Sequence, residues 1–411
     1  MPTVALRTLG CRLNQAESDE ILIALADRGI AVDNDDPQIL VINTCTVTTE
    51  ASSASRKLIR RSVKEHPGSK VVVTGCYALA HEDEVRAMAG VDAVLPVKET
   101  LPGAVAEEAG AAAVPIDFEG PRRNLRVQTG CDEQCTFCVV PATRGPLDSR
   151  PLDEVLVHAR RLVDSGAAEL VVSGVHLGTY GQGTDDSLVD LIQALSSIEG
   201  LARIRLSSIE ASHVDTALLE QMASNPKVCR HIHLPLQTGS ERTWVRMQRP
   251  GTLSRFLAVA DAARETVPGI AITTDIMVGF PGEDEAAFAQ TLEVIDRVGF
   301  EKLHVFRYSA RVGTPAAGYS EQVAHEVRRE RSKVVRELGD SIRRRWLDSL
   351  IGSRVPVLVE KAVADGIVGH TDSYALVRFG GSADSVGQVR EVDVSSRSRG
   401  TLLGADVGSP W

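Results

Sequence analysis

Apolar and polar positions in about the first hundred residues alternate between two periods. Short apolar runs, typical of strands, are separated by longer stretches in which apolar residues recur every three or four positions, as on one face of a helix. The pattern predicts strands over 4–10, 39–44, 70–75 and 91–96 and helices over 14–28, 49–65 and 82–88. Strand–helix alternation at this spacing predicts an open, parallel α/β sheet.

A second series of the same kind begins near Asn124. It predicts strands over 124–129, 169–173, 203–208, 231–236, 271–278 and 302–309. Helical patterns over 152–165, 188–197 and 285–298 separate them, and a helix-rich stretch continues to about Leu350. Six such units fall short of the eight of a full barrel, so we predict a partial (β/α)6 barrel.

The chain changes character after Leu350. Short β-rich runs over 355–360, 374–379 and 388–394 are separated by Gly, Ser and Asp, which predicts a small all-β barrel. Residues 101–120, rich in Ala, Gly and Pro, have the composition of a linker. We therefore expect three domains, over 1–118, 119–350 and 351–411.

The composition is that of an ordinary globular protein with a substantial core. Of 411 residues, 43% are hydrophobic and 24% are charged, and the formal net charge is −10. The amino terminus lacks the pattern of a secretory signal, and no apolar run approaches the roughly 18 residues that a membrane helix needs. Seven cysteines are too sparse, and odd in number, for a disulfide scaffold. We expect a cytoplasmic protein with no membrane partner, whose grouped cysteines bind metal or take part in catalysis.

Three cysteines form a compact C-x3-C-x2-C motif after the first strand of the second series. We call Cys131, Cys135 and Cys138 the compact triplet. Three thiolates this close can ligate three corners of a four-iron cluster and leave the fourth iron open. A structural zinc site usually has four protein ligands, and no fourth Cys or His lies nearby in the sequence. A chance grouping of structural thiols is the other alternative.

Three further cysteines each follow a predicted strand of the first series. We call Cys11, Cys45 and Cys76 the strand-end triplet. In a parallel sheet the carboxyl ends of the strands share one edge, where α/β folds place their ligand sites. These thiols are therefore expected to meet, although three buried thiols acting as small hydrophobes remain an alternative. Cys229 stands alone and is interpreted as structural.

These motifs resemble a known family. The compact triplet at the head of a partial barrel resembles the radical S-adenosylmethionine (SAM) superfamily, and the segments around the strand-end triplet look like those of the methylthiotransferases. Within that group the chain is most similar to the tRNA threonylcarbamoyladenosine methylthiotransferases, on the segments 174–181, 205–210, 235–240, 275–283 and 305–309. The segment 369–374 is similar to their TRAM domain. The resemblance implies an N-terminal open parallel α/β sheet, a central radical-SAM barrel and a TRAM-like C-terminal barrel.

The resemblance also implies two [4Fe–4S] clusters and two molecules of SAM per turnover. The compact triplet would hold the cluster whose open iron binds the amino and carboxylate groups of SAM. Electron transfer there would split SAM into methionine and a 5′-deoxyadenosyl radical, which would take hydrogen from an unreactive C–H. The strand-end triplet would hold an auxiliary cluster carrying the sulfur, and the second SAM would supply the methyl group.

Further SAM contacts are expected at strand ends, and the resemblance implies no catalytic residue beyond the cluster ligands. Gly174 matches the position where backbone approaches the SAM amino group, although it is equally an ordinary strand-end turn. Ser208 and Gln237 could hydrogen-bond the ribose and the carboxylate. Asp275 begins its segment inside a strand, where a buried structural hydrogen bond and catalysis both remain open.

The expected reaction is methylthiolation of threonylcarbamoyladenosine, at carbon 2 of the adenine, in the tRNA anticodon loop. Ala142 and Gly251 depart from relatives that commonly have Tyr there, so both positions lack an aromatic face for a base. The same chemistry on a protein or peptide side chain therefore stays open, as does isopentenyladenosine of tRNA. A non-catalytic iron–sulfur or zinc-binding RNA module is disfavoured, because the compact triplet heads a complete strand series.

The implied partners are a substrate, an electron donor and a source of sulfur. The substrate is tRNA or a protein or peptide, the donor is a low-potential protein such as flavodoxin or ferredoxin, and a separate sulfur donor is needed. The basic run of Arg343, Arg344 and Arg345 lies in a helical pattern. It fits a solvated helix face or a phosphate contact.

Overall fold

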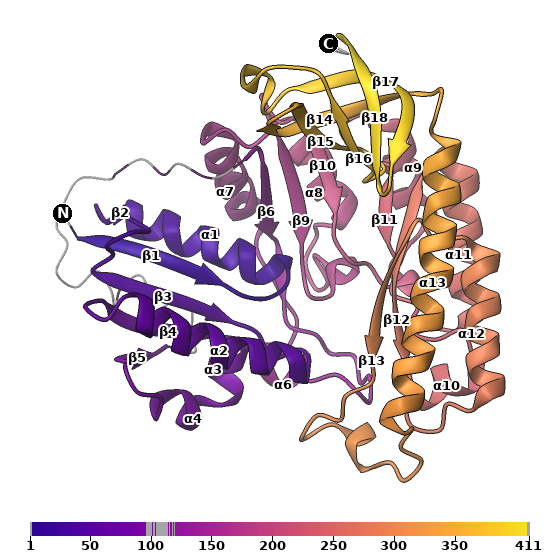
Figure 1. Ribbon diagram of the computed structural model, residues 1–411, viewed down its shortest axis with the longest axis horizontal. Coiled ribbons are helices and arrows are strands. Elements are labelled where there is room, and N and C mark those ends of the chain that lie inside the picture. The colour runs from indigo at the N-terminus through magenta and orange to yellow at the C-terminus, as the bar shows by residue number, and fades with distance from the viewer. Residues whose placement is uncertain are drawn as a thin grey trace. The chain divides into compact units, whose positions relative to one another are not determined.

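The computed structural model describes residues 2–95 and 120–408, together with 101, 103, 114, 116 and 118 (Figure 1). The expected linker over 101–120 lies largely outside the described residues, as do Pro96 and the last three residues of the expected C-terminal domain. The chain forms two compact units. The first comprises Met1–Phe118, Thr129–Asp132 and Cys138–Leu147, and the second comprises Glu119–Gln128, Glu133–Phe137 and Asp148–Trp411.

The first unit is built on a five-stranded parallel sheet, which confirms the expected open α/β fold. Its strands are β1 (Thr3–Thr8), β2 (Ala31–Val32), β3 (Ile39–Thr44), β4 (Lys70–Gly75) and β5 (Ala93–Val94), in the order β2-β1-β3-β4-β5. Its helices are α1 (Arg12–Ala26), α2 (Thr49–Glu65), α3 (Cys76–Ala80), α4 (Glu82–Arg86) and α6 (Val140–Arg144).

Helices cover both faces of this sheet, as Figure 1 shows for α1 and α2. Val41 of β3 packs in one apolar cluster with Leu25 of α1, whereas its neighbour Ile42 packs in another with Ile59 of α2. Alternate residues of a strand point to opposite faces, so a strand covered on both faces must be apolar throughout. This requirement explains why β3 and β4 have the bounds that the sequence predicts.

The second unit contains the six expected parallel strands. They are β6 (Arg122–Arg126), β9 (Glu169–Ser173) and β10 (Arg203–Leu206) in one sheet, and β11 (His231–His233), β12 (Ala271–Val278) and β13 (Lys302–Arg307) in another. A parallel bridge between Ser208 and His233 joins the two sheets beyond β10 and β11. The strands therefore follow one another in chain order, which confirms the partial barrel.

Helices pack between and outside these strands. They are α7 (Leu152–Asp164), α8 (Leu188–Ser196), α9 (Thr216–Ser224), α10 (Glu241–Arg246), α11 (Leu253–Thr266), α12 (Glu285–Val298) and α13 (His325–Ser349). The helix α12 is capped at both ends. At its N-terminus Asp284 Oδ1 accepts a hydrogen bond from Ala287 N, and at its C-terminus Gly299 adopts a left-handed conformation. The long α13 runs along β13 and α12 (Figure 1). Of the described helices, none is long and apolar enough to cross a membrane.

Short elements complete the two units. The strand β7 (Gln128–Thr129) precedes the compact triplet, and β8 (Asp148–Ser149) follows α6. Short 3₁₀ helices occur at Leu177–Thr179, Ala211–His213, Pro315–Gly318 and Ala383–Ser385.

The end of the second unit is a closed five-stranded barrel, as the β-rich pattern predicts. Its strands are β14 (Arg354–Val363), β15 (Gly366–Thr371), β16 (Leu376–Phe379), β17 (Val389–Ser398) and β18 (Thr401–Gly408), closed in the order β14-β15-β16-β18-β17. The sequence analysis missed β15 and β18. Both contain a glycine where strands approach closely, since a Cβ on Gly369 would lie 1.8 Å from Leu358 O and one on Gly404 2.5 Å from Asp393 O.

A buried cluster of charged residues joins this barrel to the strands β6, β9 and β10. Glu169 Oε1 lies 2.8 Å from Arg205 Nε and 2.9 Å from Arg122 Nε, and the side chains of Glu169 and Arg205 are fully buried. Arg205 also donates hydrogen bonds to Asp372 O (2.8 Å) and Thr371 O (3.1 Å) of the barrel. Arg122 also pairs with Glu360 of β14, so one buried carboxylate holds two arginines that both bind the barrel.

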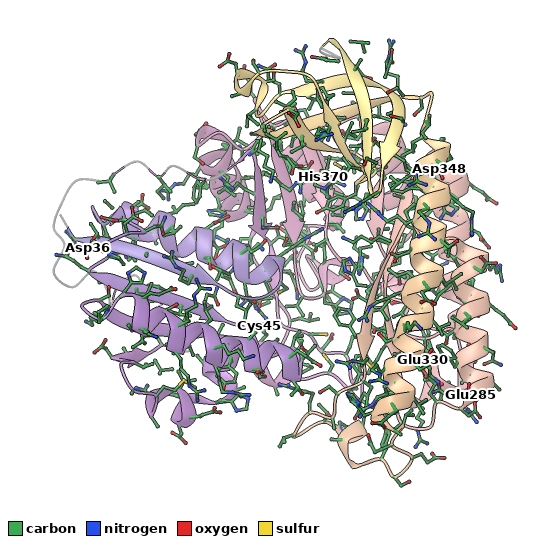
Figure 2. All side chains as sticks on the ribbon, in the orientation of Figure 1. Asp36, Cys45, Glu285, Glu330, Asp348 and His370 are labelled. Atoms are coloured by element: carbon green, nitrogen blue, oxygen red, sulfur yellow. The ribbon has the colours of Figure 1, made fainter. Side chains whose placement is uncertain are left out.

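Neighbouring groups reinforce the same contact. Arg203 donates hydrogen bonds to His370 O (2.9 Å) and Pro356 O (2.8 Å) of the barrel, and Figure 2 labels His370 there. The ring of Tyr374 lies 4.5 Å from the Arg205 guanidinium carbon and stacks on His231 at 5.1 Å. The barrel is thus bound to the partial barrel mainly through arginines.

The charge on Glu169 is maintained by these arginines. Burial by itself raises the pKa of this carboxyl, but Arg205 and Arg122 outweigh burial and lower the pKa to about 2. Because the pKa in an unfolded chain is about 4.3, Glu169 contributes stability above that pH, and the contribution is lost as the pH falls toward 2.

We predict that Glu169→Gln lowers the free energy of unfolding at pH 7 by roughly 3–5 kcal/mol, because it leaves buried arginines without their carboxylate. The difference from the wild type should shrink as the pH is lowered from about 4.3 toward 2. Denaturant unfolding across this pH range measures both effects. Asp393→Asn, which breaks a half-exposed pair with Arg354, is the matched control and should change little. An unfolding midpoint for Glu169→Gln equal to that of the control would contradict the assigned role.

Candidate functional site

The three cysteines of the strand-end triplet lie where neighbouring strands of the first unit end. Cys11 precedes α1 after β1, Cys45 directly follows β3, and Cys76 begins α3 directly after β4. The strands β1, β3 and β4 are adjacent and parallel, so their carboxyl ends lie at one edge. Figure 2 labels Cys45 at this edge.

The thiols of the strand-end triplet are within electrostatic reach of one another. Burial raises the pKa of the Cys45 thiol, and the negative charges of Cys11 and Cys76 raise it further, while Arg144 opposes them. Cys45 is buried, Cys76 is half-buried and Cys11 is exposed. The site is therefore a set of three thiols that opens to solvent on the Cys11 side.

Two asparagines fix the backbone around these thiols. Asn14 Nδ2 donates hydrogen bonds to Asn43 Oδ1 (3.1 Å) and Thr44 O (3.0 Å), and Asn43 Nδ2 donates to Asn14 O (2.9 Å). Cys11 Sγ donates a hydrogen bond to Asn14 Oδ1 at 3.5 Å. Because Asn14 and Asn43 are fully buried, these bonds satisfy polar groups that water does not reach.

Gly75 is needed for the close approach of β4 to β3. It has φ of +96°, and a Cβ there would lie 2.4 Å from both Asn43 Oδ1 and Thr44 O. No side chain fits this position without moving the backbone that carries Cys45 and Cys76. Ser55 holds Cys45 from the opposite side, donating to Cys45 O at 2.7 Å and accepting from Cys45 N at 3.1 Å.

The structure adds Arg144, a residue to which the sequence analysis gave no role. Arg144 Nη1 lies 2.8 Å from Glu17 Oε1 and Nη2 lies 2.9 Å from Asn14 Oδ1. Only 7% of the Arg144 side chain and 5% of the Glu17 side chain are exposed. Burial lowers the pKa of Arg144, but Glu17, Cys76 and Cys11 outweigh burial and raise it, so the guanidinium stays charged.

The compact triplet spans residues 131–138 of one loop. Cys131 and Cys138 belong to the first compact unit and Cys135 to the second. Cys138 Sγ accepts a hydrogen bond from Val140 N (3.4 Å), and Cys131 N donates to Gly145 O (3.2 Å). Gly130 precedes the loop with φ of +71°, and a Cβ there would lie 1.6 Å from Pro146 O, so only glycine fits this turn.

Arg249 and Glu210 form the surroundings of Cys135. Arg249 Nη1 and Nη2 donate to Glu210 Oε1 (2.9 Å) and Oε2 (2.7 Å), and Nη1 lies 3.9 Å from Cys135 Sγ. Burial raises the pKa of Cys135, and the charge of Arg249 opposes this rise. Arg249 is itself buried and puts a positive charge where a thiolate ligand would need one. The matched segment 205–210 contains Glu210, but its pairing with Arg249 is visible only in the fold.

The three predicted SAM contacts lie at carboxyl ends of strands of the partial barrel. Gly174 follows β9, Ser208 lies beyond β10 and Gln237 beyond β11, each half-buried. Gln237 has φ of +64°, an uncommon conformation for a residue other than glycine. Gln237 N donates to Asp275 O at 2.8 Å, and Gln237 O accepts from Met277 N at 2.8 Å. Strained backbone of this kind is typical of ligand sites.

The surroundings of Asp275 and of Cys229 favour a structural role for each. Asp275 Oδ1 lies 3.4 Å from His233 Nε2. Burial raises the pKa of Asp275, but His233, His304 and Arg249 outweigh burial and lower it, which favours a structural contact of the ionised carboxylate over a catalytic acid. Cys229 is fully buried, and burial raises its pKa to about 12, so it is a neutral structural thiol.

Three polar residues without a predicted role lie close together in space, and one of them, Glu133, belongs to the loop of the compact triplet. Glu133, His176 and His213 place potential metal-ligand atoms within 4.8 Å of one another. His176 Nε2 lies 3.2 Å from Glu133 Oε1, and its ring meets that of His213 edge-on at 4.8 Å. These contacts hold the three side chains together in the fold.

Known protein families match two separate parts of the chain. Residues 125–295 match the radical SAM superfamily, and residues 3–96 match the uncharacterized protein family UPF0004. A threonylcarbamoyladenosine tRNA methylthiotransferase, MtaB, of Bacillus subtilis is 35% identical over 96% of this chain and 94% of its own length. MtaB of Thermotoga maritima is 34% identical, covering 97% and 95%. A tRNA-2-methylthio-N(6)-dimethylallyladenosine synthase of Sulfurovum sp. is 33% identical, covering 98% and 99%.

Solved structures support the fold. The radical SAM methyltransferase TsrM of Kitasatospora setae matches with a TM-score of 0.57 at 15% identity, covering 77% of each chain. The cobalamin-dependent radical SAM enzyme OxsB matches with a TM-score of 0.50 at 11% identity, covering 83% of this chain and 56% of its own.

We predict that Gly75→Ala destabilises the first unit by roughly 1–3 kcal/mol, because alanine is strained at this φ and its Cβ would overlap Asn43 and Thr44. The displaced backbone carries Cys45 and Cys76, so the iron content of the anaerobically purified protein should also fall. Thermal unfolding and iron analysis measure the two effects. Gly68→Ala, before the same strand and with no atom within 4 Å of the added Cβ, is the control. Equal behaviour of the two variants would show that the tight approach at Gly75 is not required.

Proposed function

Because the chain belongs to the radical SAM tRNA methylthiotransferase family, we propose that it methylthiolates threonylcarbamoyladenosine, at carbon 2 of the adenine, in the tRNA anticodon loop. The observation that carries this choice is the match, over nearly the whole chain, to two relatives named for threonylcarbamoyladenosine. The relative named for dimethylallyladenosine is almost as similar, so isopentenyladenosine of tRNA is the second candidate.

Membership of the family implies a [4Fe–4S] cluster and SAM. We propose that Cys131, Cys135 and Cys138 hold this cluster. The residues fit such a group, because Cys138 Sγ accepts a backbone hydrogen bond and Arg249 brings a buried positive charge to Cys135. When bound, the cluster and SAM together supply one-electron chemistry that activates an unreactive C–H.

The protein's own residues would then position SAM. Gly174 carries no Cβ, which would lie 2.9 Å from Gln128 Oε1 and 3.2 Å from Leu177 Cα, and without one its backbone could approach the amino group. Ser208 and Gln237 offer a hydroxyl and an amide at neighbouring strand ends, where they would bind the ribose and carboxylate. Half-buried Glu210 keeps Arg249 in place beside Cys135.

A second [4Fe–4S] cluster is proposed at Cys11, Cys45 and Cys76. Its support is the shared sheet edge, the mutual influence of the three thiols, and the buried amides that fix their backbone. This cluster would carry the sulfur, and a second molecule of SAM would supply the methyl group. The reaction also needs a low-potential electron donor such as flavodoxin or ferredoxin, and a sulfur donor.

We further propose that the chain works as three domains, over 1–118, 119–350 and 351–411. The closed barrel would act as a TRAM-like module that docks RNA in the cytoplasm, where tRNA is modified. Within the basic run of α13, Arg343 Nη1 already donates to Glu301 O (3.2 Å) and Arg345 lies 3.4 Å from Asp296. These contacts favour a helix face engaged with its own protein over a dedicated phosphate site.

The two positions without an aromatic residue do not decide the substrate. Ala142 is exposed on α6, and Gly251 has φ of +67°, where its carbonyl accepts a hydrogen bond from Trp244 Nε1 at 3.2 Å. A peptide or protein substrate therefore remains the alternative to tRNA.

We predict that replacing the two sets of cysteines impairs different steps of the reaction. Replacing the compact triplet by alanine should abolish reductive cleavage of SAM. Replacing the strand-end triplet should lower the iron content by about half, since one of two four-iron clusters is lost, and should stop product formation while SAM cleavage continues. Iron analysis and quantification of 5′-deoxyadenosine measure these losses, and Cys229→Ala is the control. Full product formation by the strand-end variant would show that these thiols are structural.

We predict that anaerobic turnover adds a methylthio group to purified tRNA bearing threonylcarbamoyladenosine, and adds less to tRNA bearing isopentenyladenosine. Nucleoside mass spectrometry of the two tRNAs, with the compact-triplet variant as the blank, measures the products. Faster modification of isopentenyladenosine would move the assignment to that nucleoside. No shift on either tRNA, despite active SAM cleavage and two loaded clusters, would favour a protein or peptide substrate.

A further inference from the structure

The strand-end triplet has a buried positive charge beside it that the proposed reaction does not yet use. Arg144 ends α6, the helix that follows Cys138, and so comes from a segment far along the chain from Cys11, Cys45 and Cys76. Its two terminal nitrogens are bonded to Glu17 and Asn14, both on α1, and its side chain is almost fully buried. One polar residue, Asn14, therefore contacts both the guanidinium and the Cys11 thiol.

We propose that Arg144 is a positioning and charge-compensating residue of the strand-end cluster, supplied to that site by the loop of the compact triplet. The proposal rests on the proposed function, which assigns a [4Fe–4S] cluster to Cys11, Cys45 and Cys76. Arg144 does not ligate the cluster. It acts through Asn14, which it helps to orient, and through its charge.

Charge balance supports this role. Three thiolates and their cluster concentrate negative charge at a site that is half-closed to water, where electrostatic interactions are strong. Burying an arginine is costly unless it is paired, and Glu17 provides one partner.

The alternative is an ordinary salt bridge that only packs α6 against α1. The two roles differ in their effect on the reduction potential of the cluster. A fixed positive charge favours the more negative, reduced state and so raises the midpoint potential, whereas a fixed negative charge lowers it. Removing Arg144 and removing Glu17 should therefore shift the potential in opposite directions, although both changes break the same salt bridge.

The test uses the full chain with Cys131, Cys135 and Cys138 replaced by alanine, so that only the strand-end triplet can hold a cluster. Anaerobic redox titration followed by electron paramagnetic resonance gives the midpoint potential. Arg144→Gln should shift it downward, Glu17→Gln should shift it upward, and Arg144→Lys, which keeps the charge, should lie between Arg144→Gln and the parent. Arg331→Gln is the matched control, because Arg331 is equally buried and lies 2.7 Å from Glu283 in the second unit.

Each outcome is decisive. Shifts of opposite sign for Arg144→Gln and Glu17→Gln, with no shift in the control, support the proposal. Shifts of the same sign, or none, overturn it and leave a packing salt bridge. If Arg144→Gln fails to take up the cluster, the direction of the Glu17→Gln shift decides alone. A parent that takes up no cluster would instead contradict the proposed function of the strand-end triplet.

Discussion

The site of the first unit depends on one constraint, the close parallel approach of β3 and β4 at their carboxyl ends. Gly75 makes this approach possible, since a Cβ would lie 2.4 Å from Thr44 O and from Asn43 Oδ1. Once the strands are this close, the residues that follow them, Cys45 and Cys76, must leave the sheet at the same edge. Asn14 ties the start of α1, next to Cys11, to that edge, because its amide donates to Asn43 Oδ1 and Thr44 O at the end of β3. Backbone geometry and two buried amides therefore bring three cysteines that are tens of residues apart in the sequence to one edge of the sheet.

In the second unit, the amino-terminal ends of three strands bind the C-terminal barrel. There Arg122, Glu169 and Arg203 stand at the first positions of β6, β9 and β10, and together with Arg205 they hold the C-terminal barrel. The carboxyl ends of the same strands stay free of this contact and carry Gly174 and Ser208. The partial barrel therefore binds the C-terminal barrel at its amino-terminal strand ends, and the carboxyl-terminal ends, where the SAM contacts are proposed, take no part in this contact. Removing the barrel would expose Glu169 and Arg205, so substitutions are better probes of its role than truncation.

The sequence predicted those features that local patterns determine. The bounds of β3, β4, β9 and β12 are those that the pattern predicts. In β3, β4 and β9 the reason is that buried strands of a parallel sheet read as nearly continuous apolar runs. The barrel strands β15 and β18 were missed because the glycines required for close packing weaken that signal. The helix α3 was missed because it begins at Cys76 directly after a strand, with no side chain capping it. The meeting of Cys11, Cys45 and Cys76 was predictable from the topology of parallel strands. Arg144 was not, since its partners Glu17 and Asn14 lie 127 and 130 positions away.

Buried arginines of both units are paired with carboxylates. Arg205 and Arg331 form such pairs inside the second unit, and these pairs hold elements together. Arg144 and Arg249 are also paired with carboxylates, and each belongs to the surroundings of a proposed cluster site. If the cysteines there ligate clusters as proposed, a buried cation at each site would compensate the negative charge of the thiolate ligands. A neighbouring arginine does not by itself identify a ligand, because Cys229 lies near Arg205 and burial still raises the pKa of its thiol to about 12.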